Sequence, residues 1–163
     1  ARHKLCPSLV INTHGHYDHI GGDDAFGVEV YVHAKDALLL RDPKFNLSGF
    51  FALPYQVKSE IRVVEDGALI ALDALELKVL HMPGHTQGGI PLLMQKPKDT
   101  IVFTGDTLFC AGIGRSDFSG GNETQLLTSI REKLLTLADD VIVYPGHGPA
   151  TTIGAEKKHN PYL

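Results

Sequence analysis

The 163-residue sequence lacks a long hydrophobic run, and its two cysteines, Cys6 and Cys110, stand far apart. A helix that crosses a bilayer needs about 20 consecutive apolar residues, and no charged-then-apolar leader precedes the first expected strand, so we expect no membrane association. The cysteines form no Cys-x-x-Cys pair. This spacing indicates neither a disulfide framework nor a zinc ribbon, and it favours a reducing cytoplasm as the location.

Clustered positive charge is also missing. The chain carries 15 Lys and Arg against 19 Asp and Glu, a net charge of -4, and its longest basic run is the pair Lys157-Lys158. Because nucleic-acid-binding proteins carry a basic patch, we expect no nucleic acid partner. No repeat, low-complexity tract or linker divides the chain, so residues 1–163 are expected to form one domain with a real core.

Short β-branched segments bounded by turn residues dominate the chain. Strands are expected at Ser8 to Asn12, Val28 to His33, Ile61 to Val64, Leu69 to Leu72, Leu75 to Met82, Gly89 to Met94, Thr100 to Thr104 and Val141 to Tyr144. Apolar spacing predicts helices at 35–41 and 123–137, the second capped by Asn122. Residues 43–60 follow neither period and are expected to form an aromatic loop near an entrance. The strands look predominantly antiparallel, which favours an α+β fold with sheets packed under helices.

What the chain has in abundance is histidine, and the placement is not random. Of nine histidines, five follow an expected strand directly, three of them in the stretch "THGHYDHIGG". The five are His14, His16, His19, His85 and His147. Loops at strand ends let distant parts of a sequence converge on one point. The remaining four, His3, His33, His81 and His159, have no such placement and are expected on the surface or in the core.

Together with Asp18 and Asp106, these five imidazoles make seven candidate metal ligands. Seven are too many for one tetrahedral zinc, whereas two ions that share a carboxylate would each receive three or four ligands and leave room for a bridging water. Each motif also has a plainer interpretation. The first cluster could be a solvated loop, "PGHT" and "GHGP" could be backbone turns, and Asp106 could bond its own backbone in an Asx turn. Their combination favours metal binding.

Four stretches, "THGHYDHIGG", "MPGHTQGG", "FTGDTLF" and "YPGHGP", resemble in order and spacing the metal motifs of the metallo-β-lactamase superfamily. Within it, "GDTLFCAGIGRSDF" and "TTIGAEKKHNPYL" resemble the short glyoxalase II-like hydrolases. The resemblance implies an αββα sandwich with two divalent metal ions in a cleft at one edge of the sheets. It implies that His14, His16 and His85 hold the first ion, that Asp18, His19 and His147 hold the second, and that Asp106 bridges both.

The chain departs from that family pattern in three places. Only thirteen residues precede His14, so the sandwich is expected to lack its N-terminal strands. Either the chain is a truncated or processed piece, or it has an edge that a partner chain covers. A homo-oligomer is among the expected partners. Only sixteen residues follow His147, so no C-terminal helical domain for glutathione is expected. "GPAT" replaces the tyrosine that such two-domain members carry. Arg115 is the one positive group expected near the site to receive a substrate carboxylate.

The resemblance implies a binuclear hydrolase in which a metal-bridging hydroxide attacks a small anionic thioester of the S-2-hydroxyacylglutathione type. Asp18 and Asp106 are the expected catalytic carboxylates, and zinc is the expected metal, with iron or manganese as alternatives. A second interpretation is a persulfide dioxygenase with one iron held by His14, His85 and Asp106. A third is a metal-binding fragment without enzymatic activity. β-Lactam or lactone hydrolysis and tRNA processing are less favoured, the last because no basic arm is present.

Overall fold

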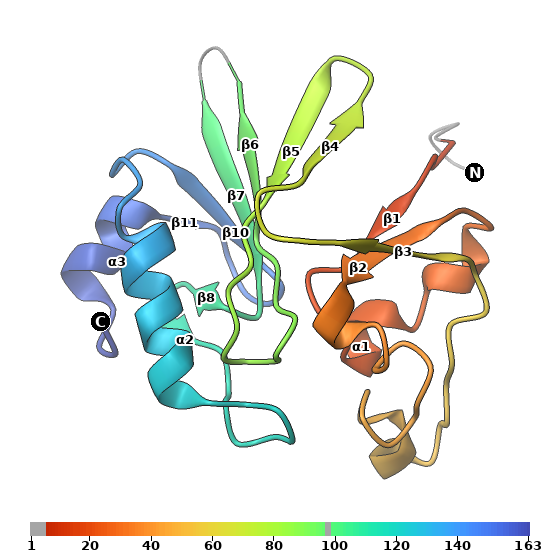
Figure 1. Cartoon of the computed structure of the whole chain (residues 1–163). Coiled ribbons are helices and arrows are strands. Elements are labelled where there is room, and N and C mark those ends of the chain that lie inside the picture. The colour runs from red at the N-terminus through yellow and green to blue at the C-terminus, as the bar shows by residue number, and fades with distance from the viewer. Residues whose placement is uncertain (1–5, 97–98) are drawn as a thin grey trace.

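Two β-sheets face each other and are covered on their outer sides by helical segments in the computed structural model, which describes residues 6–96 and 99–163 (Figure 1). The smaller sheet lies with α1 in one half of the molecule, and the larger sheet lies with α2 and α3 in the other (Figure 1). This is the αββα arrangement that the family resemblance implied. No helix in the described part of the chain is long and apolar enough to cross a membrane.

The smaller sheet has three strands, β1 (Val10–Ile11), β2 (Val30–His33) and β3 (Ile61–Val64), in that order and all parallel. The expectation of predominantly antiparallel strands is wrong for this sheet. Parallel neighbours need long crossover connections, and here these connections carry short helical segments. They are α1 (Tyr17–Ile20) and η1 (Asp23–Ala25) before β2, and η2 (Ala34–Asp36) and η3 (Ser48–Phe51) before β3.

The larger sheet has six strands in the order β11-β10-β7-β6-β5-β4. Their bounds are β4 Leu69–Leu72, β5 Leu75–Val79, β6 Leu92–Gln95, β7 Thr100–Gly105, β10 Ile142–Pro145 and β11 Thr151–Thr152. Neighbours are antiparallel except for β10, which runs parallel to β7. A small hairpin of β8 (Leu108–Phe109) and β9 (Gly112–Ile113) follows β7. All eight expected strands are present, several of them shorter than expected.

The expected helix at 123–137 is confirmed as α2 (Glu123–Ser129), which continues into the π-helical turn η4 (Ile130–Leu134). Asn122 caps it, because its side-chain oxygen accepts a hydrogen bond from the backbone N–H of Gln125. The α-helix expected at 35–41 is wrong. That stretch forms η2 and a series of turns with hydrogen bonds to the third residue back, such as Leu39 N–H to the carbonyl of Asp36.

Two helices in the described residues, the single turn α1 and the longer α3, were not expected from the sequence. α3 (Ile153–His159) starts after Thr152, whose hydroxyl accepts a hydrogen bond from the N–H of Ala155 at 3.2 Å. Three basic residues occupy its last turn, where they complement the partial negative charge of the helix end. A capping threonine and a basic last turn are ordinary helix signals. A helix of only seven residues is too short for its apolar spacing to stand out in the sequence.

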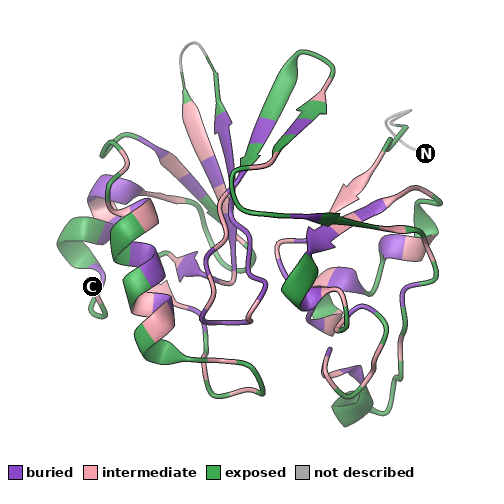
Figure 2. Cartoon of the chain, viewed as in Figure 1, coloured by how far each residue is buried: buried purple, intermediate pink, exposed green. Residues whose placement is uncertain are grey.

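The buried apolar side chains form three core layers. Figure 2 marks in purple where buried residues fall along the strands and helices. The strand β7 shows how the sequence builds these layers, because Val102 packs toward α2 and α3 while Ile101 and Phe103 pack between the two sheets. Tyr31 of β2 lies on the other side of that same intersheet layer. The third layer, with Ile20 of α1, lies on the outer face of the smaller sheet. Alternating strand residues therefore serve two layers at once.

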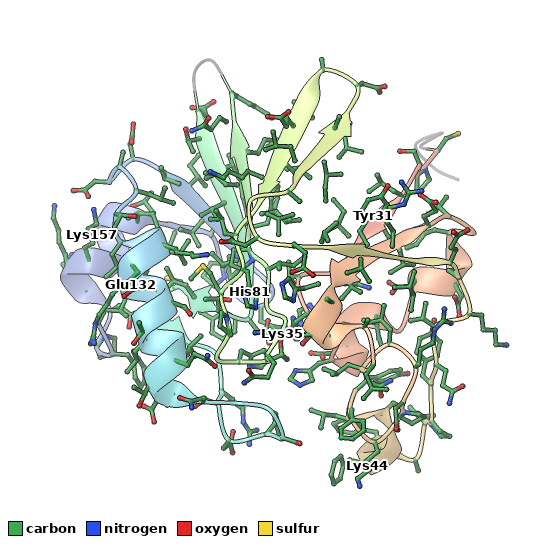
Figure 3. The ribbon with its side chains drawn as sticks, in the orientation of Figure 1. Tyr31, Lys35, Lys44, His81, Glu132 and Lys157 are labelled. Atoms are coloured by element: carbon green, nitrogen blue, oxygen red, sulfur yellow. The ribbon has the colours of Figure 1, made fainter. Side chains whose placement is uncertain are left out.

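Two histidines that the sequence placed on the surface or in the core form a stacked pair between the halves. The rings of His33 and His81 lie 3.9 Å apart and nearly parallel, and His33 is buried. His81 lies near the centre of the molecule, beside the end of β2 (Figure 3). His159 is exposed on α3, and His3 lies outside the described residues. Of the three that lie in the described residues, His33, His81 and His159, none joins the cluster described next.

Candidate metal centre

All seven candidate ligands lie at one edge of the two sheets, each shortly after a strand. The loop after β1 and helix α1 supply four of them, and the loops after β5, β7 and β10 supply one each. In that order they are His14, His16, Asp18, His19, His85, Asp106 and His147. The structure therefore brings together the whole set that the sequence singled out, from both halves of the molecule.

The first part of the cluster is a buried group of three imidazoles, those of His14, His16 and His85. Nε2 of His85 lies 2.9 Å from Nδ1 of His16 and 3.3 Å from Nε2 of His14. The other ring nitrogen of His85 lies 2.6 Å from the backbone carbonyl oxygen of Arg115 and donates its hydrogen there. That bond leaves a lone pair on Nε2 directed at the two other rings, an arrangement typical of metal-bound histidine.

The second part is open to solvent and combines imidazoles with carboxylates. Nε2 of His147 lies 3.1 Å from Oδ2 of Asp18, and both side chains are more than half exposed. Nε2 of His19 lies 3.6 Å from Oδ2 of Asp18 and 3.3 Å from Oδ1 of Asp106. Asp106 is nearly buried and lies between the two parts, because its Oδ2 is 3.8 Å from Nε2 of His85 and 3.7 Å from that of His147.

The protonation states fit this division. Burial, followed by the neighbouring imidazoles, lowers the pKa of His14 well below its usual value. Burial and the nearby ring of His85 lower the pKa of His16 to about 4. Burial raises the pKa of Asp106, but three surrounding imidazoles, His19 foremost, outweigh it and bring this pKa below its usual value. Near neutral pH, His14 and His16 are therefore uncharged and Asp106 is ionised, which are the forms that bind metal.

Two buried polar atoms in the cluster have no hydrogen-bond partner within the described chain, Nε2 of His19 and Oδ1 of Asp106. A buried polar atom without a hydrogen-bond partner costs free energy, so two such atoms in one cluster indicate that a further group binds there. Three sets of donor atoms are close enough to hold an ion: His14, His16 and His85; His14, His19 and Asp106; and Asp18, His19 and His147. The residues present thus fit divalent metal ions.

These sets differ in one respect from the ligand division that the family resemblance implied. His14 belongs to two sets, once with His16 and His85 and once with His19 and Asp106. The two groups of three that the resemblance assigned to separate ions both occur among them. Asp106 occupies the middle position expected of a bridging carboxylate, with one oxygen toward His19 and the other toward His85. The assignment of each ligand to an ion remains a prediction.

A buried carboxylate that the sequence analysis missed ties the ligand loops together. Asp36 is fully buried, and its Oδ2 accepts a hydrogen bond from the N–H of Gly15, between two histidines of the first loop. Its Oδ1 accepts one from the N–H of Gly88 in the loop that carries His85. Burial raises the pKa of Asp36, although the hydrogen bonds from these two amides oppose the effect. Its only sequence signal was an acidic residue inside an apolar stretch.

A glycine allows the last ligand loop to approach the centre. A Cβ at Gly146 would overlap Oδ1 of Asp106 and the ring of His19. The N–H of Gly146 also donates to the carbonyl of Gly105, next to Asp106. Any larger residue at position 146 would therefore push His147 away from the other donors.

Arg115 lies beside the centre, but its positive charge is already paired with a carboxylate. Its guanidinium makes two hydrogen bonds to the carboxylate of Asp117, at 2.9 and 2.8 Å, and lies 4.2 Å from the centre of the Phe118 ring. Its backbone carbonyl holds His85. The structure thus shows Arg115 next to the site and engaged with Asp117, and the proposed contact with a substrate carboxylate remains a prediction.

A cavity of about 370 Å³ opens directly over the centre. His16, Asp18, His85, Asp106 and His147 line its floor, and Tyr17, Leu47, Phe51, Phe109, Arg115 and Phe118 line its walls. Its volume is in the range of small-molecule sites. Leu47 and Phe51 come from the 43–60 segment, which the sequence analysis expected near an entrance.

Comparison with known proteins agrees with this geometry. Residues 6–147 match the family model described as the metallo-β-lactamase superfamily. The chain belongs to this superfamily. The match confirms the superfamily that the four histidine and aspartate motifs indicated. The protein therefore belongs to a superfamily of metallo-hydrolases, and its cluster of His and Asp side chains suits divalent metals.

Individual members of the superfamily resemble the chain over nearly its whole length. The hydroxyacylglutathione hydrolase GloC of Haemophilus influenzae is 40% identical, over 95% of this chain and 75% of its own. The crystal structure of BLEG-1 B3 metallo-β-lactamase has a TM-score of 0.91 at 38% identity, covering 99% of this chain and 79% of that one. A structure of TTHA1623 in a di-iron-bound form has a TM-score of 0.78 at 33% identity, covering 98% and 79%.

Proposed function

We propose that the protein is a binuclear metal-dependent hydrolase that cleaves thioesters of the S-2-hydroxyacylglutathione type. The observation that carries the proposal is the convergence of seven donor side chains into a buried group and an open group under one cavity. A closed donor set suits an ion that stays in place, whereas an open one leaves a position for water or substrate. The similarity to the hydrolase GloC supports the choice of substrate.

In this proposal His14, His16 and His85 would hold one ion and Asp18, His19 and His147 the other, with Asp106 as a ligand available to both. Divalent ions bound there would supply Lewis acidity toward a carbonyl and a lowered pKa for water. We propose zinc, with iron or manganese as alternatives, because imidazole and carboxylate ligands suit all three. The di-iron-bound form of the similar protein TTHA1623 supports iron as one of these alternatives.

The side chains of the open group would orient the reactants. Asp18 is more than half exposed at the cavity floor, with its Oδ2 held 3.1 Å from Nε2 of His147. A carboxylate in that position can accept a hydrogen bond from an attacking water and fix its direction. A thiolate is a good leaving group, so the reaction needs no strong general acid. The aromatic walls of the cavity would keep bulk water from the scissile bond.

The test combines metal analysis with an activity assay. We expect mass spectrometry of protein purified without added metal to find about two divalent ions per chain, and we expect hydrolysis of S-lactoylglutathione. Asp106→Ala should lower kcat/KM by at least about a thousandfold, because both donor groups lose the carboxylate between them. Steady hydrolysis that survives Asp106→Ala would contradict the proposal. A single iron per chain together with oxygen uptake on glutathione persulfide would favour the dioxygenase instead.

A further inference from the structure

The cavity over the metal centre has a polar floor and apolar walls. Four apolar side chains face it from two sides, Leu47 and Phe51 from the η3 segment and Phe109 and Phe118 from the segments after β7. Most small-molecule sites combine apolar walls of this kind with a few polar groups that fix orientation. Here most of the polar groups are the metal donors, with Tyr17 and Arg115 beside them. The apolar walls are therefore left to recognise the group attached to the reacting carbonyl.

The wall formed by η3 is held in place by buried polar groups. The side chain of Asn46 donates to the carbonyls of Leu39 and Tyr55, and its oxygen accepts the N–H of Ser48, all at 2.9 Å. Ser48 is fully buried, and its hydroxyl accepts the N–H of Tyr55. The wall is therefore anchored to the body of the smaller half and does not depend on a substrate to form.

The backbone of the wall segment around η3 is also strained at both ends. Leu47 has φ of 71° and Ala52 has φ of 55°, in the left-handed region that residues with a Cβ rarely adopt. Such conformations persist where surrounding structure enforces them, often next to a ligand site. The segment lies beside Lys44 at the outer end of the smaller half (Figure 3). It presents Phe50 and Phe51, exposed by 80% and 67%, although aromatic rings are normally buried.

The distribution of charge in the cavity also favours an apolar substrate group. Among the described residues that line it, Arg115 is the only Lys or Arg, and Asp117 already neutralises its guanidinium. A substrate with a charged acyl side chain would find no free cation on these walls. A substrate with an apolar acyl side chain would cover Phe51 and Leu47, and it would remove their apolar surface from water.

We propose that the wall of Leu47 and Phe51 binds the side chain of the acyl group and makes the enzyme selective for thioesters with an aromatic or branched aliphatic acyl group. This inference rests on the proposed thioester hydrolysis and specifies its substrate. An aromatic ring against this wall gains contact area and an aromatic pairing with Phe51, whereas a methyl group reaches neither. Burial of several additional carbons supports a preference of about tenfold or more.

The experiment compares two glutathione thioesters that differ only in a phenyl for a methyl group, S-mandeloylglutathione and S-lactoylglutathione, on the zinc-loaded protein. We expect kcat/KM to favour the mandeloyl substrate by about tenfold. Phe51→Ala should lower this ratio to near one, and Phe51→Leu should keep most of it. The matched control is Phe50→Ala, because Phe50 is the more exposed neighbour and does not line the cavity.

A binding measurement separates this inference from the proposed function. Calorimetry with the free acids should show mandelate binding about tenfold more tightly than lactate, and Phe51→Ala should abolish the difference. Equal kcat/KM for the two thioesters, with equal binding of the two acids, overturns the selectivity and leaves thioester hydrolysis standing. Tighter binding of mandelate through Phe51 without turnover of either thioester supports the apolar site and overturns the proposed reaction.

Discussion

At the residue scale, the carboxylate of Asp36 shows how a residue that binds no metal can govern a metal site. It is fully buried, and it accepts hydrogen bonds from Gly15 and Gly88, which lie in two separate ligand loops. The amide N–H groups are fixed donors, so both carboxylate oxygens are needed as acceptors. The position of His14 and His16 relative to His85 therefore depends on Asp36.

We expect Asp36→Asn to weaken metal binding more than it destabilises the fold. The amide nitrogen of Asn would face one backbone N–H as a second donor, so one of the two loops would lose its anchor. Mutation of groups that support metal ligands typically costs 10–100-fold in affinity. Competition with a fluorescent zinc chelator measures this loss, and Asp140→Asn, at an exposed site, is the control. Unchanged zinc affinity in Asp36→Asn would show that Asp36 has no role in positioning the ligands.

At the element scale, another carboxylate fastens the segment that leads into β3 to the one that follows α1. Asp24 accepts hydrogen bonds from the N–H groups of Lys58 and Ser59 and from the hydroxyls of Ser59 and Tyr55. Burial raises the pKa of Asp24, but these bonds outweigh it and bring the pKa below its usual value. The ionised form is thus favoured in the folded state, and its stabilisation exists above the unfolded pKa and disappears as the pH falls through the folded pKa.

Asp24→Asn should therefore lower the free energy of unfolding by about 1–2 kcal/mol at pH 7. The difference from the original protein should shrink below about pH 4, where the unfolded chain already carries a protonated aspartate. Urea unfolding at pH 7 and pH 3.5 measures both values, with the exposed Asp140→Asn again as the control. A destabilisation that stays constant between the two pH values would mean that the ionised carboxylate is not what holds the segment.

The elements also show what a sequence pattern can and cannot predict here. Eight strands and the helix after Asn122 were predictable, because β-branched runs and helical spacing reflect local burial. The convergence of the histidine loops was predictable as well, since each loop follows a strand. The parallel order of β1, β2 and β3 was not, because it depends on long crossovers without a local signal. Asp36 was missed because its partners are backbone amides 21 and 52 residues away.

At the scale of the whole molecule, the candidate metal centre joins the two halves. Four of its side chains follow β1 in the smaller half, and three follow strands of the larger sheet. The intersheet core layer packs the halves together elsewhere, and at this edge imidazoles and carboxylates from both halves meet. Metal ions bound to both sides would act as a cross-link, because a ligand that binds only the folded state stabilises it.

Removal of metal by a chelator should therefore lower the melting temperature by about 10 °C. Metal at 1,000 times its dissociation constant contributes about 4 kcal/mol, and each kcal/mol shifts the melting temperature of a domain near this size by about 2–4 °C. Calorimetry with and without chelator measures the shift. His85→Ala, which removes a ligand from the larger half, should abolish most of it, whereas His159→Ala, on the exposed end of α3, should leave it intact. If complete loss of metal left the melting temperature unchanged, the centre would not be what holds this edge of the two halves together.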